Sequence, residues 1–165
     1  MSIVCCRVED KEISIASDSI TVRGWTQEKD RNNHTKLFKV EDIIIGGVGY
    51  CEETSLLQIF CRTTRPSEAK ESDLLTFLEN FSEWKNKRTK KYDIQNSYIM
   101  AVKGHAFYIQ SFFIKEILTY DAIGAGADYA LSALYLGSDV EKAVETACEL
   151  SVLCEKPIKK IIMEK

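Results

Sequence analysis

Residues 42–49, DIIIGGVG, and residues 52–64, EETSLLQIFCRTT, contain the change of pattern that decides the fold. The first stretch is a short apolar run that ends in glycines, which is typical of a buried strand. The second stretch places Leu56, Ile59 and Phe60 on one face of a helix. A strand that runs almost directly into an amphipathic helix predicts a chain that combines sheets with helices.

Strand patterns fill the chain before this point. Residues 2–8, SIVCCRV, and residues 13–19, ISIASDS, are apolar or alternating and are separated by a polar turn, so they predict a hairpin. Residues 35–40, TKLFKV, follow a polar loop at 27–34 and pair with residues 42–49 as a second hairpin. Two hairpins therefore precede the first helix.

The rest of the chain contains three more helical patterns and four more strand patterns. We predict helices at 67–87, 127–137 and 139–155, with Ser67 and Asp139 as N-caps, and strands at 97–102, 105–112, 116–124 and 158–163. Two antiparallel sheets stacked face to face, with a helix pair on each outer face, would bury every apolar stripe in this order. The prediction is a four-layer αββα sandwich of the α+β class, in one domain over residues 1–165.

Composition argues against several classes of function. The 165 residues include 22 Lys and Arg against 25 Asp and Glu, a formal net charge of −3, so no nucleic-acid partner is expected. The basic run at residues 85–91 follows an amphipathic helix, and we interpret it as a solvated helix end. Because no apolar run approaches the roughly 18 residues of a membrane span, and no signal peptide opens the chain, we expect a cytoplasmic protein without membrane contacts.

The six cysteines and two histidines form no metal or redox motif. There is no C-x-x-C pair and no histidine cluster beside a cysteine, so neither a metal nor a cofactor is expected. We expect reduced thiols that pack as small hydrophobic groups. Cys5 or Cys6 could act as an N-terminal nucleophile only after four or five residues were removed at junctions unlike processing sites. His34 and His105 are expected at the surface.

Five motifs taken together resemble one family. They are SIVCC at 2–6, Asp18 at the end of the second strand, Lys36 followed by Leu-Phe, IIIGGVG at 43–49, and AIGAGADYALSALYL at 122–136. In this order and spacing they resemble the proteasome β-subunit and HslV family of N-terminal nucleophile (Ntn) hydrolases, over nearly the whole chain. The resemblance implies hydrolysis of peptide bonds in peptides or unfolded proteins, a homo-oligomeric ring, and an ATPase as a candidate partner.

The resemblance also implies a catalytic site made of Ser2, Asp18, Lys36 and Gly46. If Met1 is removed, Ser2 carries a hydroxyl and a free α-amine, whose pKa near 8 suits it to act as a general base. The Lys36 ammonium would favour the developing alkoxide, and Asp18 would orient that lysine. The backbone N–H of Gly46, favoured by similarity over that of the next glycine, would contact the oxyanion.

Departures from the family pattern keep a second interpretation open. The family has threonine as its nucleophile, and sliding the first strand by one residue would put Met1 in that place. Ala125 stands where the family has a serine, and the aspartate expected on the last long helix has only Ser151 or Glu155 as stand-ins. The alternative is a catalytically inactive relative that acts as an assembly or interaction subunit.

Overall fold

The strands form two sheets of unequal size and a separate hairpin. The computed structural model describes residues 2–29 and 35–165. One sheet has four strands in the order β10-β1-β2-β11, the other has five in the order β5-β6-β7-β8-β9, and β3 pairs with β4. The bounds are β1 Ile3–Val8, β2 Glu12–Ser17, β3 Ile20–Arg23, β4 Thr26–Lys29, β5 Leu37–Val40, β6 Ile43–Val48, β7 Ser97–Val102, β8 His105–Gln110, β9 Phe113–Ile117, β10 Tyr120–Gly124 and β11 Lys159–Glu164.

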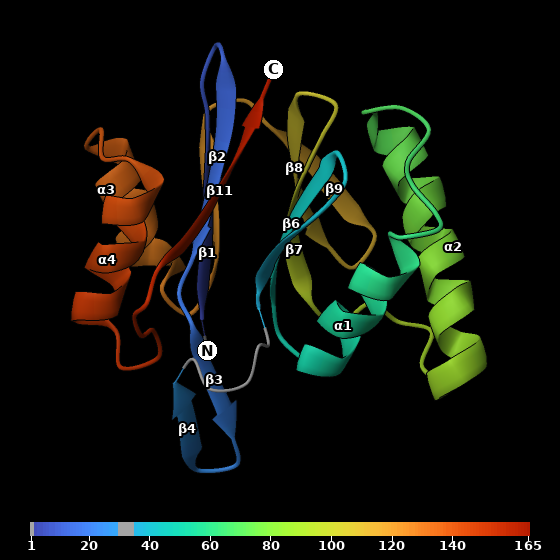
Figure 1. Ribbon diagram of the computed structural model, residues 1–165, viewed down its shortest axis with the longest axis horizontal. Helices are drawn as coiled ribbons and strands as arrows, with labels where there is room; N and C mark the ends of the chain where they lie inside the picture. Colours follow the sequence, from blue (N-terminus) through green and yellow to red (C-terminus); the bar gives the residue numbers. More distant parts are fainter. Residues whose placement is uncertain (1, 30–34) are drawn as a thin grey trace.

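A pair of helices covers the outer face of each sheet (Figure 1). Helices α3 (Ala127–Tyr135) and α4 (Val140–Leu150) lie on the four-stranded sheet, and α1 (Cys51–Phe60) and α2 (Glu71–Thr89) lie on the five-stranded one. The predicted four-layer αββα order is therefore confirmed. Within the described ranges, no helix is long and apolar enough to cross a bilayer.

Strand β1 shows how the sequence builds the layers. Its alternate side chains Ile3 and Cys5 pack against α3 and α4, whereas Val4 and Cys6 pack against the five-stranded sheet. This is the period of two expected for a strand, with both faces apolar because both are covered. The start of β1, which carries Ser2, is consequently held in the centre of the sandwich.

The chain crosses between the sheets where we predicted one strand at 116–124. That stretch contains the end of β9, in the five-stranded sheet, and all of β10, which pairs with β1 in the other sheet. The predicted meander is thus wrong at its last strand. The pairing of Gly124 with Ile3 brings the glycine beside Ser2, whose carbonyl oxygen would lie 2.3 Å from a β-carbon at residue 124. The crossover therefore packs the end of β10 against the backbone of Ser2.

The last long helix is shorter than the predicted 139–155. Its N-cap is Asp139, as predicted, and the carboxylate accepts the backbone N–H of Lys142 at 2.8 Å. The helix ends at Leu150, and the following loop runs past the start of β1, where the carbonyl of Leu153 accepts the N–H of Ser2. The loop therefore contributes to the same region as β10.

Two other predicted boundaries are wrong. Helix α2 begins at Glu71 after Lys70, not after Ser67, because the Ser67 hydroxyl donates to the side chain of Asp73 instead of capping the backbone. The predicted polar loop at 27–34 contains the end of β4, which pairs with β3 around a turn in which Gly24 has a φ of 59°. Residues 30–34, and with them the expectation for His34, lie outside the described residues.

Two side chains on α1 and α2 face the opposite way from our prediction. Ile59 is 50% exposed, and Leu57 is buried in its place. Lys85, in the run interpreted as a solvated helix end, is 3% exposed, and its Nζ lies 2.6 Å from Oε2 of the buried Glu53. A carboxylate on α1 thus makes burial of this lysine possible, which local sequence could not show.

We expect Gly46→Ala to destabilise the fold, because a β-carbon at residue 46 would lie 2.4 Å from Cγ1 of Val4 where the sheets meet. Overpacking of this kind costs about 1–3 kcal/mol of unfolding free energy. Urea unfolding of Gly46→Ala, Val4→Ala and the double variant measures the effect. The double variant should lose less than the sum of the single losses, since Val4→Ala removes the conflicting methyl; strictly additive losses would contradict the contact.

Candidate active site

Four segments of the chain meet at the carboxylate of Asp18. The residue is 1% exposed and follows β2. Its Oδ1 accepts the N–H of Ile3 at 3.0 Å and the Nζ of Lys36 at 2.7 Å. Its Oδ2 accepts the N–H of Ile20 at 3.3 Å and that of Glu155 at 3.2 Å. These donors replace the lost hydration of the charge and fix its orientation.

Lys36 is the cation of this site. It is 8% exposed and precedes β5. Burial lowers the pKa of its ammonium from the ordinary value of 10.5, and the charge and hydrogen bond of Asp18 oppose that shift. The main chain of Lys36 is also fixed, because its carbonyl accepts the N–H of Gly47 at 2.8 Å. The predicted pairing of Lys36 with Asp18 is present in the structure.

Ser2 is buried at the end of the same strand and is held by its backbone. Its N–H donates to the carbonyl of Leu153 at 3.0 Å, and its own carbonyl accepts the N–H of Gly126 at 3.3 Å. Its φ is 120°, in a region that side-chain-bearing residues rarely adopt, at a cost of roughly 1–3 kcal/mol. Because φ is defined by the preceding carbonyl carbon, this strain would vanish if residue 1 were removed.

Ser2 and Lys36 line one small cavity of about 90 Å³. Its other walls come from β3 and from the glycine-rich end of β6 with the first turn of α1. They are Ile20, Thr21, Val22, Gly47, Gly49, Cys51 and Thr54. The cavity therefore brings Ser2 and the buried ammonium of Lys36 close to the backbone of two glycines, Gly47 and Gly49.

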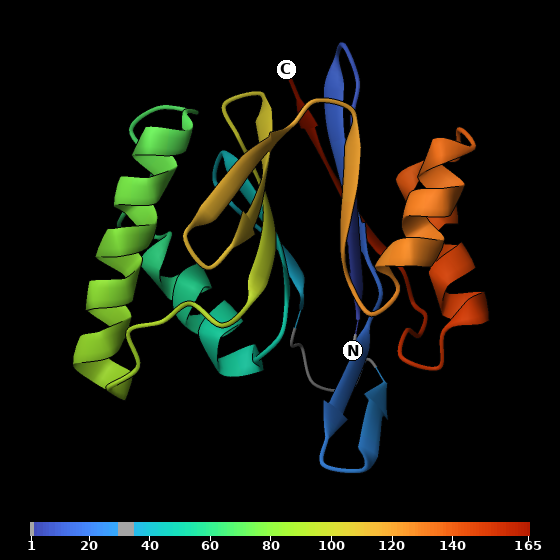
Figure 2. The same cartoon turned by 180° about the vertical axis from the view of Figure 1, so that it is seen from behind.

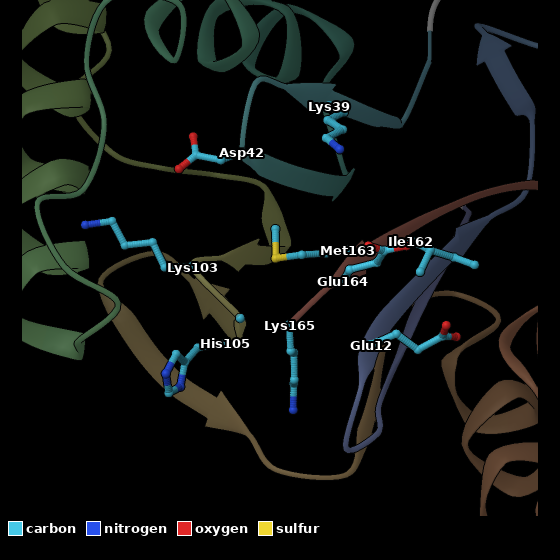
Figure 3. A pocket seen from close by; sticks show the side chains of 10 residues that line it. Glu12, Lys39, Asp42, Lys103, His105, Ile162, Met163, Glu164 and Lys165 are labelled. Atoms are coloured by element: carbon cyan, nitrogen blue, oxygen red, sulfur yellow. The ribbon is translucent and has the colours of Figure 1, made fainter.

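A larger cavity of about 860 Å³ lies among the turns at residues 41–42 and 103–104 and the end of β11, and it contains none of the predicted site residues (Figure 3). Its charged side chains are exposed apart from the half-buried Glu12, and Figure 3 shows Glu12 and Lys103 on opposite sides without converging. His105 is one of its lining residues and is exposed, as predicted, with Nδ1 2.7 Å from Glu116 Oε1. We therefore place the candidate chemistry in the small cavity.

The structure does not bring Gly46 to that cavity. The N–H of Gly47 is directed to β5, where it donates to Lys36. Since successive residues of a strand direct their N–H groups to opposite sides, the N–H of Gly46 faces β7, where its partner is Ile99. Gly49 does line the cavity, and its N–H has no hydrogen-bond partner among the residues that the structure describes. Sequence reasoning found the glycine-rich motif but not the glycine with the free donor.

Ser151 and Glu155, the two candidates to replace the expected aspartate, do not place a carboxylate beside Ser2. The Ser151 hydroxyl accepts the N–H of Leu153 at 3.2 Å and so shapes the loop whose carbonyl contacts Ser2. Glu155 contributes its backbone N–H to Asp18. Ala125 carries no hydroxyl, and the turn around it contacts Ser2 through the backbone of Gly126.

The thiols of β1 are unsuited to nucleophilic attack. Cys5 and Cys6 are fully buried, and burial raises the pKa of both, that of Cys6 to about 12. All six cysteines are free, and of these Cys51 is exposed and lines the cavity beside Ser2.

Solved structures share this arrangement over almost the whole chain. HslV from Trypanosoma brucei superposes with a TM-score of 0.73 at 17% identity and covers 99% of both chains. The fold is the HslV fold. Anbu, an ancestral β-subunit from Yersinia bercovieri, has a TM-score of 0.73 at 15% identity over 98% of this chain and 81% of its own.

A third neighbour is BPH from Thiobacillus denitrificans in complex with epoxomicin, with a TM-score of 0.87 at 20% identity over 98% of both chains. No protein-family model matches the chain, and no curated protein sequence matches it. The superpositions establish the HslV fold, but sequence identities this low establish nothing about activity. The chemistry therefore has to be argued from the site itself.

We expect Asp18→Asn to destabilise the protein by about 3–5 kcal/mol, because it leaves the Lys36 ammonium buried without its countercharge. The double variant Asp18→Asn with Lys36→Met should recover a large part of that loss, since neither charge then remains. Urea unfolding at pH 7 measures both variants.

The deficit of Asp18→Asn relative to the double variant should shrink as the pH approaches 10.5. Burial lowers the pKa of Lys36 below this value in the folded state, so between the two values the unfolded state binds more protons and rising pH favours folding. A deficit that stayed constant or grew between pH 7 and pH 10 would show that Lys36 is not buried as described.

Proposed function

We propose that the chain is an HslV-like peptidase in which Ser2, exposed by removal of Met1, is the N-terminal nucleophile. The observation that carries the proposal is the double role of Asp18, which binds the N–H of Ile3 and the Nζ of Lys36 through the same oxygen. This arrangement fixes the residue before Ile3 next to a buried cation, and both groups line one cavity.

The geometry supports a simple acyl-transfer sequence. The Ser2 hydroxyl oxygen attacks the substrate carbonyl while the α-amine of Ser2 takes the hydroxyl proton. The Lys36 ammonium stabilises the developing negative charge, and the free N–H of Gly49 donates to the oxyanion. The protonated amine then passes its proton to the leaving amine as the C–N bond breaks, and water hydrolyses the acyl ester on Ser2.

The strained backbone at Ser2 supports removal of Met1. A φ of 120° is tolerated poorly by serine, and it exists only while residue 2 is linked to residue 1. The surrounding structure therefore fits a chain that begins at Ser2 better than one in which Ser2 is an internal residue.

The remaining parts of the proposal follow from the resemblance. The substrates are peptides or unfolded proteins, the assembly is a homo-oligomeric ring in the cytoplasm, and an ATPase is a candidate partner. Exposed apolar side chains support self-association: Tyr135 and Leu136, at the end of α3, are solvent-exposed and line one shallow surface pocket.

A catalytically inactive assembly or interaction subunit is the second candidate function. It is favoured by two observations: the Ser2 nitrogen contacts the backbone carbonyl of Leu153, and Ala125 lacks the hydroxyl that the family uses near this point. In that case the sandwich and its exposed apolar residues would be retained without turnover.

We expect Ser2→Ala to lower the turnover of fluorogenic peptides by roughly 10³-fold or more, because no other group replaces the attacking oxygen. Ser72→Ala, at an exposed serine of α2, is the matched control and should keep wild-type activity. Mass spectrometry of protein from its native host should find Ser2 as the first residue.

Epoxomicin, the ligand of the BPH structure, provides an independent test of the same site. A structure of the complex should place it in the cavity lined by Ser2 and Lys36, and Ser2→Ala should weaken its binding. Retained Met1, with no turnover in wild type or Ser2→Ala, would exclude the peptidase and favour the inactive subunit.

A further inference from the structure

A buried amide holds the residue that follows Gly49. Asn96, 1% exposed, accepts the N–H of Tyr50 on Oδ1 at 2.6 Å. Its Nδ2 donates to the carbonyl of Tyr50 at 2.9 Å and to the hydroxyl of Thr54 at 3.1 Å. One side chain therefore binds both backbone groups of Tyr50 and a residue of the cavity wall.

Asn96 also packs against Gly49 itself. A β-carbon at residue 49 would lie 2.1 Å from Oδ1 of Asn96, and the φ of Gly49 is 131°. A glycine is required at this position for both reasons, the positive φ and the close approach of the amide. The direction of the Gly49 N–H thus depends on the turn at Gly49 and Tyr50, which the Asn96 side chain holds by packing and hydrogen bonds.

Asn96 is held in turn by a buried carboxylate on α1. Oε1 of Glu53 accepts the N–H of Asn96 at 2.9 Å and the hydroxyl of Tyr98 at 3.1 Å. Burial, followed by the charge of Glu53, raises the pKa of Tyr98 well above its ordinary value, so the phenol stays protonated and remains a donor. The carboxylate thereby fixes the backbone of Asn96 from the core side.

Lys85 on α2 neutralises that carboxylate. Its Nζ donates to Oε2 of Glu53 and to the carbonyl of Asp93, both at 2.6 Å. Figure 2 shows the segment between α2 and β7, which includes Asp93 and Asn96, running past α1. Two helices and the start of β7 thus converge on one amide.

A buried ion pair is weak evidence for stability, because apolar residues of the same size often serve as well. Here the Glu53–Lys85 pair is joined by one hydrogen bond to Asn96, whose side chain holds the turn at Gly49 and Tyr50. That placement, outside the set of groups that the proposed reaction uses, points to a positioning role.

We propose that Asn96, held by Glu53 and Lys85, is a positioning residue that directs the N–H of Gly49 into the cavity for the oxyanion. The inference rests on the proposed function, since it assumes that Ser2 forms an oxyanion there. Asn96 does not touch substrate and acts through the backbone of Tyr50.

The test compares Asn96→Ala and Asn96→Asp with the control Asn86→Ala on α2. Asn96→Ala removes both hydrogen bonds to Tyr50, whereas Asn96→Asp keeps the side-chain size and the oxygen that accepts the Tyr50 N–H but replaces the donor amide with a carboxylate oxygen. We expect kcat per titrated active site to fall by about 10- to 100-fold in both Asn96 variants with KM nearly unchanged, since the misdirected donor acts in the transition state. Asn86→Ala should keep wild-type values.

Hydrogen exchange supplies a readout that does not depend on turnover. In Asn96→Ala, the amide of Tyr50 loses its acceptor and should exchange at least about tenfold faster than in wild type, while the protection of β7 and β8 is retained. A merely structural role would lower the active fraction or the unfolding midpoint and leave kcat per active site unchanged.

The outcomes separate the two proposals. A folded Asn96→Asp protein with wild-type kcat, or unchanged exchange of the Tyr50 amide in Asn96→Ala, would overturn the positioning role while Ser2-dependent turnover persisted. Absence of Ser2-dependent turnover in wild type would instead overturn the proposed function, and the catalytic meaning of Asn96 with it.

Discussion

The carboxylate of Asp18 is the interaction on which the rest of the candidate site depends. A charge that is almost fully withdrawn from water is costly unless it is paired and hydrogen-bonded, and this one is both. Its donors come from β1, from β3, from the residue before β5 and from the loop after α4. Because those segments belong to different layers, stacking of the sheets and assembly of the site are a single physical constraint.

Two buried carboxylate–lysine pairs support residues that line the cavity. Asp18 with Lys36 fixes the side that carries Ser2, and Glu53 with Lys85 supports the side that carries Gly49. Both pairs are satisfied by further hydrogen bonds, which rigidify their surroundings. Ion pairs at the exposed surface, such as that of Lys142 with Glu145, contribute little by comparison. Among the residues that the structure describes, buried charge is therefore concentrated around the backbone segments that line the cavity.

Periodicity and motif order were enough to predict the layers and the meeting of Ser2, Asp18 and Lys36, because these features depend on local pattern and on a family resemblance. Three features were out of reach. The crossover before Tyr120 depends on which sheet accepts β10, and the burial of Lys85 depends on Glu53 from a different helix. The choice between Gly46 and Gly49 depends on strand phase, which is set by the pairing with β5 and β7. Each is a long-range property that neighbouring residues do not encode.

The hydrogen bond between Asp18 and Glu155 spans 137 positions of the sequence, and β2 pairs on its outer side with β11. During synthesis the hairpin of β1 and β2 leaves the ribosome long before Glu155 and β11 have been made. Until residues 155–164 emerge, one edge of β2 has no strand beside it, and such an edge can pair with another nascent chain. Completion of the pocket therefore waits until residues 155–164 are free to pair with Asp18 and β2, long after the first hairpin has formed.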